Sequence, residues 1–280
     1  VLRTRRPLGT IGGDARAFWK DVRLLKIQRG GSSQRDMVHM LEEILESEYD
    51  LRPEDCGSPP RAFIYIDDAV FTGNRIAGDL EEWIVSDAPE HAVVHVVAIA
   101  VHSGGQYYAE QRALKAIDAA GKDISIKWWR CLDFENRKLF ADDSDVLWPT
   151  AIPDQTDVKS YVSSLKHKPV LREPSGVGKL RIFSSVQARH LLEQEFLRAG
   201  VRIRTLCPNL NPYQRPLGNS LLETVGFGSL LVTFRNCPNN TPLALWAGDP
   251  WYPLFPRSTN NDALSRRMAE LLGLGARANR

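Results

Sequence analysis

Residues 23–130 alternate short β-branched and aromatic runs with stretches in which apolar residues recur every three or four positions. Short continuous apolar runs indicate strands, whereas the three-to-four spacing indicates helices that bury one face. The pattern predicts strands at residues 23–28, 63–66, 93–101 and 124–129, with a helix in each gap. Alternation of this kind is typical of an α/β fold with a mostly parallel central sheet flanked by helices.

Start and stop residues agree with these helices. Ser33 and Asp36 resemble a capping box at the beginning of the first helix. Ser103 and the two glycines after it open the third helix, and Gly121 closes it.

The pattern loosens after residue 135. Residues 136–178 are rich in Asp, Pro, Ser and Lys, which predicts an irregular cap region. Two further strands are expected, at residues 180–183 and 227–234. Two further helices are expected at residues 185–199, where Gly200 ends the helix, and at residues 262–272. We therefore predict an α/β core over residues 1–135 and a C-terminal extension over residues 136–280 that packs on it.

Composition limits the class of protein. With 280 residues, 43% of them hydrophobic and 25% charged, the chain can bury a substantial core. Its longest apolar run, residues 92–101, is far shorter than the roughly 20 residues that cross a bilayer, so we expect no membrane partner. Four widely spaced cysteines and the lack of an apolar signal segment favour a reduced, cytoplasmic setting.

Charge is uneven although the net charge is only +2. The first thirty residues contain eight Lys or Arg residues and two acids, Asp14 and Asp21. Such a segment attracts phosphates, so nucleic acid is one candidate partner of the basic N-terminus. An ordinary solvated surface is the alternative interpretation.

One segment carries candidate chemistry. The strand at 63–66 leads into Asp67 and Asp68, and the loop through Thr72 and Gly73 leads into a helix. Unpaired N–H groups at a helix N-terminus can hold a phosphate, and carboxylates can accept hydrogen bonds from a ribose diol, directly or through a divalent ion. Neighbouring strand side chains point to opposite faces, so both acids can address one ligand only where the strand is already turning.

A strand followed by D-D-x-x-x-T-G and a helix resembles the phosphoribosyl-pyrophosphate motif of type I phosphoribosyltransferases. The resemblance implies a type I phosphoribosyltransferase-like fold, with Asp67 and Asp68 as catalytic ribose-positioning residues and indirect ligands of Mg²⁺. It implies that the phosphate is bound by Ala69, Thr72, Gly73, Asn74 and Arg75. Phe71, Asn74 and Arg75 depart from the usual motif, so the 5′-phosphate pocket is expected to be altered.

An earlier loop fits the same resemblance. Type I enzymes cradle pyrophosphate in a loop upstream of the main motif, and the corresponding residues here are Gly30, Gly31, Ser32 and Ser33. Taken alone, this sequence is equally typical of a plain helix-capping turn.

A closer resemblance lies in residues 183–196, 226–246 and 251–257. These stretches are similar to the phosphoribosyltransferase-like domain of bacterial conflict systems, which implies an effector of anti-phage loci such as retrons, with partner proteins from such a locus. Arg189, Glu193, Asn236 and Asn240 become site candidates. Alternatively, the first two form an ordinary surface pair on a helix, and the asparagines are turn formers.

Three functions remain open. The first is an enzyme that uses phosphoribosyl pyrophosphate or cleaves the N-glycosidic bond of nucleotides, NAD or RNA. The second is a non-catalytic sensor that binds a nucleotide-like ligand and switches a partner protein. The third is a metal-dependent phosphohydrolase in which Asp67 and Asp68 bind the metal.

Overall fold

The chain divides into two compact units, residues 1–134 and residues 135–280. A computed structural model describes residues 14–30, 33–173, 180–207, 209–221, 224–233, 237–248 and 251–255. No helix in these ranges is long and apolar enough to cross a membrane. The elements of the first unit are α1 (Ala15–Lys20), β1 (Val22–Leu24), α2 (Ser33–Tyr49), the 3-10 helix η1 (Pro53–Asp55), β2 (Ala62–Val70), α3 (Asn74–Ser86), β3 (His91–His102), α4 (Ser103–Ala120) and β4 (Asp123–Phe134).

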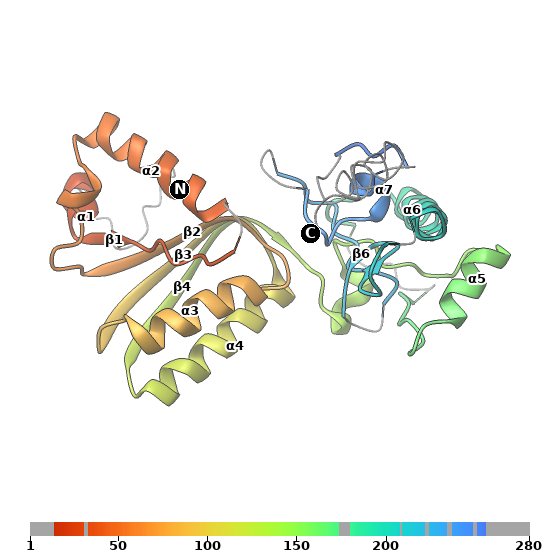
Figure 1. The fold of residues 1–280 in the computed structure, drawn as a ribbon, viewed down its shortest axis with the longest axis horizontal. Helices are drawn as coiled ribbons and strands as arrows, with labels where there is room; N and C mark the ends of the chain where they lie inside the picture. Colours follow the sequence, from red (N-terminus) through yellow and green to blue (C-terminus); the bar gives the residue numbers. More distant parts are fainter. Residues whose placement is uncertain are drawn as a thin grey trace, which may run out of the picture. The chain divides into compact units, whose positions relative to one another are not determined.

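The first unit is built on a parallel sheet with the order β1-β2-β3-β4 (Figure 1). The longest pairings join β2 to β3, as far as Val70 opposite Val101, and β3 to β4, where His95 lies opposite Lys127. This arrangement confirms the predicted α/β fold with a parallel sheet flanked by helices.

Alternation along the strands divides the core between the two sheet faces. Phe63 and Tyr65 of β2 belong to the cluster that α3 and α4 cover, together with Val94, Val96 and Ala98 of β3. Ile64 belongs to the opposite cluster, with side chains from α1 and α2. On that second face the β3 and β4 positions are more open, because Ile99 is 46% exposed and Cys131 is also exposed.

Two strands differ from the prediction in a way that affects the site. β1 ends at Leu24, and the chain then continues in extended form beside β2, where the Leu25 N–H donates to the Ile64 carbonyl at 2.8 Å. β2 runs four residues beyond the expected end, to Val70, because its pairing with β3 continues that far. Ser33 was predicted to cap α2 from the position before the helix, but it is the first residue of the helix itself.

The second unit has little regular structure beyond one long helix, as the sequence predicts for its first part. Its elements are η2 (Lys138–Asp143), α5 (Thr156–Ser163), α6 (Val186–Leu206), β5 (Gln214–Arg215), β6 (Gly218–Asn219) and α7 (Leu243–Trp246). Leu197 and Val201 of α6 pack with Leu147, Val158 and Leu217 in one apolar cluster. Ile203 and Trp246 belong to a second cluster.

Several predictions for the second unit are wrong. Residues 180–183 and 227–233 form no strand, and the expected helix at 262–272 lies outside the described residues. α6 does not stop at Gly200 but continues to Leu206. A Cβ at Gly200 would lie 2.5 Å from the Pro216 backbone, so the glycine permits close packing within the unit rather than ending the helix.

Candidate functional site

Asp67 and Asp68 lie inside β2 and are buried, with 7% and 4% of their surfaces exposed. The strand therefore does not turn at the acidic pair, whereas a turn was expected if both acids were to address one ligand. The Asp67 carboxylate accepts the Asp68 N–H at 2.9 Å, and the Asp68 carboxylate accepts the Ala69 N–H at 2.8 Å. The two carboxyl groups also interact with each other, because the charge of Asp68 and a contact with its side chain both raise the pKa of Asp67.

Asp67 contacts the earlier loop. The Ser33 hydroxyl, at the start of α2, lies near its carboxylate and lowers the pKa of Asp67. The Gln28 side-chain amide donates to the Ser33 oxygen at 3.3 Å. Two segments that the sequence places more than thirty residues apart therefore meet at the acidic pair. Gly30 lies in the loop, with no atom within 4 Å of where a Cβ would stand, whereas Gly31 and Ser32 lie outside the described residues.

Two glutamines that the sequence reasoning missed close this loop. The Gln34 side-chain oxygen accepts the N–H groups of Ile27 and Gln28, at 2.9 and 2.8 Å, and the Gln28 oxygen accepts the Gln34 N–H at 3.1 Å. Gln34 is fully buried. The sequence did contain a signal for Gln34. It is a polar residue on the buried side of an amphipathic helix, next to a glycine-rich loop.

The loop is also tied to α3. The Arg29 N–H donates to the Asp79 carboxylate at 3.4 Å, and the Arg29 guanidinium pairs with Glu82. Asp79 also accepts the Tyr65 hydroxyl of β2 at 2.9 Å. Burial raises the pKa of Asp79, and the Tyr65 hydrogen bond opposes that shift. The loop, β2 and α3 are therefore joined by one polar network.

The loop after β2 is fitted against the beginning of α4. Gly73 has φ 74° and caps α3, and a Cβ there would lie 2.0 Å from the Gly105 carbonyl oxygen. Gly73 is thus required for close packing of two backbones, a constraint present before any ligand binds. Thr72, Asn74 and Arg75 are exposed at the N-terminus of α3, where the Asn74 N–H donates to the Thr72 hydroxyl at 3.4 Å and first-turn N–H groups can meet an anion.

The residues that depart from the type I motif have partners from β3 and α4. The Phe71 ring packs on His102 with centroids 5.2 Å apart, and His102 Nδ1 bonds the Val70 carbonyl at 3.1 Å. Burial lowers the pKa of His102 to about 4, so the ring is neutral and Nδ1 is the donor. The Asn74 side-chain oxygen accepts from Arg112 at 3.1 Å. Sequence reasoning gave His102 and Arg112 no role.

Asp67 has an unusual electrostatic setting. Burial, reinforced by the charge of Asp68, raises its pKa to about 6, although the Ser33 hydroxyl acts in the opposite direction. A cation beside the carboxylate would lower that pKa again. The described residues contain no group of three metal-ligating side chains, so a metal at this pair would need further ligands from another molecule.

Glu193 and Asn240 have structural partners, whereas Nε and Nη1 of Arg189 have no hydrogen-bond partner among the described residues. Arg189 and Glu193 are buried, so the alternative interpretation as an ordinary surface pair is wrong. Glu193 pairs with Arg172 at 3.0 Å, both side chains being inaccessible, and accepts the Trp148 N–H at 3.1 Å. The Asn240 side chain donates to the Asn219 carbonyl at 3.0 Å, as a turn residue does, and Asn236 lies outside the described residues.

A parallel sheet with an acidic pair in β2, followed by a T-G loop and a helix N-terminus, is the arrangement of a phosphoribosyltransferase-like α/β domain. The sequence profile of the PRTase-CE family matches residues 5–257, nearly the whole chain. The chain therefore belongs to the PRTase-CE family. No curated protein and no solved structure matches it.

Proposed function

We propose that the first unit binds a phosphoribosyl or nucleotide-like ligand where the 28–34 loop, the acidic pair of β2 and the N-terminus of α3 meet. The proximity of Ser33 to Asp67 carries the proposal, because it brings together the two segments that type I phosphoribosyltransferases use for phosphate and ribose. Membership of the PRTase-CE family supports the same ligand class.

Each part of the site has a distinct task. The exposed α3 N-terminus, with Thr72 and Arg75, receives the 5′-phosphate, and the loop from Gly30 to Ser33 receives the pyrophosphate or its counterpart. Asp67 and Asp68 address the ribose. We assign direct contact to Asp67, which lies beside Ser33 of the 28–34 loop, and a supporting role to Asp68, whose carboxylate accepts the Ala69 N–H.

The donor set at this pair suits Mg²⁺. Magnesium is commonly held by one or two carboxylates, by water and by substrate phosphates rather than by an all-protein cage. When bound, Mg²⁺ neutralises pyrophosphate charge. Asp67 and Asp68 are the side chains that would hold it, directly or through water.

We propose N-glycosidic chemistry at this site. The ribose C1 bond to pyrophosphate or to a base breaks, and the leaving group takes the electron pair. An acceptor nitrogen or water forms the new bond to C1 and loses one proton to the leaving group or to solvent. The sugar becomes cationic on the way, so a fixed carboxylate stabilises it without a covalent nucleophile. In this proposal the substrate is a nucleotide, NAD or RNA, and the protein acts as an effector of a bacterial defence locus.

A second function is favoured by one observation. Phe71 and Asn74 replace the usual motif residues, and both are engaged by side chains of the fold, His102 and Arg112. A phosphate loop whose side chains are already engaged by other residues of the fold can bind a nucleotide without catalysing its reaction. Under this alternative the protein is a sensor that switches a partner protein.

Calorimetry with phosphoribosyl pyrophosphate tests the binding proposal. We expect binding that Mg²⁺ strengthens and that Asp67→Asn with Asp68→Asn weakens by at least tenfold, because each lost ligand hydrogen bond costs roughly 1–3 kcal/mol. Asp87→Asn, at the exposed C-terminal end of α3, is the matched control and should bind normally. Absence of binding at millimolar phosphoribosyl pyrophosphate and common nucleotides would overturn the proposal.

Mass spectrometry of nucleotides, NAD and RNA after incubation with the protein separates the two functions. New or cleaved products that disappear in the double variant indicate the enzyme. Binding without any product indicates the sensor.

A further inference from the structure

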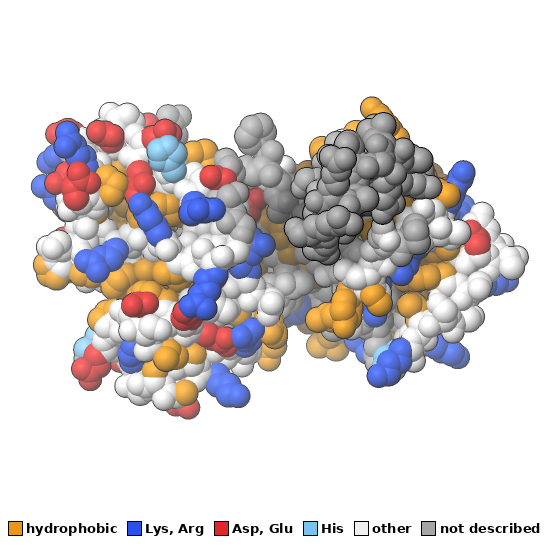
Figure 2. Space-filling model, in the orientation of Figure 1, with side chains coloured by type: hydrophobic (Ala, Val, Ile, Leu, Met, Phe, Trp, Pro, Cys, Tyr) orange, Lys and Arg blue, Asp and Glu red, His pale blue; other side chains and the backbone are white. Residues whose placement is uncertain are grey.

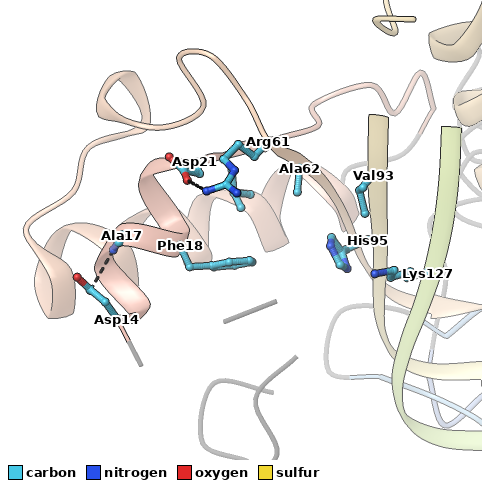
Figure 3. Close-up of a pocket in the computed structure, with 10 residues that line it drawn as sticks. Asp14, Ala17, Phe18, Asp21, Arg61, Ala62, Val93, His95 and Lys127 are labelled. Atoms are coloured by element: carbon cyan, nitrogen blue, oxygen red, sulfur yellow. Dashed lines mark hydrogen bonds and ion pairs between the residues drawn. The ribbon is translucent and has the colours of Figure 1, made fainter. Parts of the chain in front are cut away.

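A pocket of about 530 Å³ lies near the starts of the strands, on the α1 side of the sheet (Figure 3). Val22 and Ala62, at the first positions of β1 and β2, are among its lining residues. Figure 3 shows Phe18 extending from α1 toward His95, with Lys127 next to His95 on the neighbouring strand. None of its lining residues belongs to the proposed phosphoribosyl site.

His95 lies in the wall of this pocket and has a buried donor without a partner in the part of the chain that the structure describes. Its Nδ1 accepts the Trp129 indole N–H at 2.9 Å. Because an indole nitrogen only donates, Nδ1 carries no proton and the neutral ring carries its proton on Nε2. His95 is fully buried, and Nε2 has no hydrogen-bond partner among the described residues. A buried N–H without an acceptor raises the free energy of the folded protein. A ligand that accepts this hydrogen bond would remove that desolvation penalty.

Neutrality of His95 follows from its surroundings as well. Burial, and then the charge of Lys127, lower its pKa. A second proton on Nδ1 would also face the Trp129 N–H directly. His95 therefore donates one hydrogen bond from Nε2 and adds no charge.

Lys127 provides a cation beside this donor. It lies directly opposite His95 in the parallel register of β3 and β4, so the two side chains rise from one sheet face on strands about 4.8 Å apart. Within the ranges that the structure describes, no ion pair engages the Lys127 ammonium. One anionic group can accept from both side chains at once.

The remaining charges limit the ligand to a single negative charge. Asp21 already pairs with Arg61 at 3.2 Å, and the Asp14 carboxylate accepts the Ala17 N–H at 3.0 Å. With these two acids and two bases the pocket is formally neutral, so one added negative charge is tolerated, whereas a dianion would be repelled by both aspartates. The Phe18 ring and the neighbouring valines offer an apolar surface for the body of the ligand.

We propose that this pocket binds a small aromatic monocarboxylate. Its carboxylate accepts hydrogen bonds from His95 Nε2 and the Lys127 ammonium, and its ring lies against Phe18. The site is separate from the phosphoribosyl site and does not depend on the function proposed for it.

Ligand titration followed by protein NMR, on the full chain, tests this proposal with four simple probes. Benzoate should bind and shift the Trp129 indole signal. Benzamide, which lacks the charge, acetate, which lacks the ring, and phenyl phosphate, which carries a second charge at neutral pH, should each bind at least tenfold more weakly. Absence of benzoate binding at ten millimolar, or equal binding of all four probes, would overturn the proposal.

Two variants locate the binding. Lys127→Met keeps the alkyl stem and should weaken benzoate binding about tenfold, whereas Lys115→Met, on the exposed side of α4, should leave it unchanged. His95→Phe should weaken benzoate binding by a similar factor if the variant folds. If it does not fold, the comparison of benzoate with phenyl phosphate on the wild-type protein still tests the preference for a single negative charge. Equal affinities in the two lysine variants would overturn the assignment. Asp67→Asn should leave benzoate binding intact even if it abolishes phosphoribosyl binding.

Discussion

Asp67 is a carboxyl group held where its charged form is unfavourable. Its pKa of about 6 in the folded protein, against an ordinary value of 3.8, means that the folded state keeps the proton over a range in which the unfolded chain has lost it. Stability then falls as the pH rises from about 4 to about 6, because the unfolded state binds fewer protons there. This cost exists only until a cation or ligand compensates the charge.

Asp67→Asn should remove this pH dependence. The wild-type protein should lose up to about 3 kcal/mol of unfolding free energy between pH 4 and pH 7 relative to the variant, since each pKa unit corresponds to about 1.4 kcal/mol. Urea denaturation at a series of pH values measures the difference, with Asp87→Asn as the exposed control. Parallel curves for the wild type and Asp67→Asn would show that Asp67 titrates normally.

At the scale of elements, the β2–α3 turn depends on one glycine. A side chain at Gly73 would require a left-handed backbone conformation and would meet the Gly105 carbonyl of α4. Nearby in α3, Gly78 has no atom within 4 Å of where a Cβ would stand. The same substitution is therefore expected to have opposite effects at two positions five residues apart.

Gly73→Ala should destabilise the protein by at least about 2 kcal/mol, through backbone strain and displacement of α4. Gly78→Ala should be neutral or stabilising by up to about 1 kcal/mol, because alanine is the better helix former. Thermal unfolding of the two variants tests this. A stable Gly73→Ala protein that has lost ligand binding would favour an interpretation in which Gly73 serves the ligand and not the fold.

Local pattern was sufficient for the three main helices and for the existence of all four strands in the first unit. It placed the end of β2 too early, because Asp67 and Asp68 are poor strand residues that the continued pairing with β3 overrides. In the second unit Gly200 was interpreted as a helix stop, although its role is set by Pro216, a contact that no local pattern contains.

The candidate site was predictable in part. The acidic pair, the T-G loop and the upstream loop were each visible in the sequence, but their meeting through Ser33 and Asp67 is a tertiary contact. Burial of Arg189 and Glu193 was not predictable, because a four-residue spacing of opposite charges is far more often a surface pair.

At the scale of the whole molecule, each unit has its own apolar clusters, and the second also holds a buried ion pair. Arg172 contacts several backbone carbonyls besides Glu193, so removing the acid leaves an uncompensated charge in the interior.

Glu193→Ala should therefore destabilise the second unit by roughly 3–5 kcal/mol. Glu195→Ala, on the same helix but in an exposed pair with Arg198, should cost no more than about 1 kcal/mol. Denaturant unfolding measures the stability of the two variants. Calorimetry with phosphoribosyl pyrophosphate on the folded variants measures ligand binding. Normal stability of Glu193→Ala together with lost binding would assign Glu193 to the ligand instead.

Among the described strands, β4 ends the sheet, and a twelve-residue edge exposes backbone groups that can pair with a strand of another molecule. Figure 2 shows one face of the molecule, on which charged and apolar side chains are interspersed. β4 itself presents Asp123, Lys127, Arg130 and Asp133 at exposed positions, and charges of this kind discourage edge-to-edge aggregation. Lys127 thus has a second consequence: the charge beside the pocket also makes pairing of this edge with a strand of another molecule less favourable.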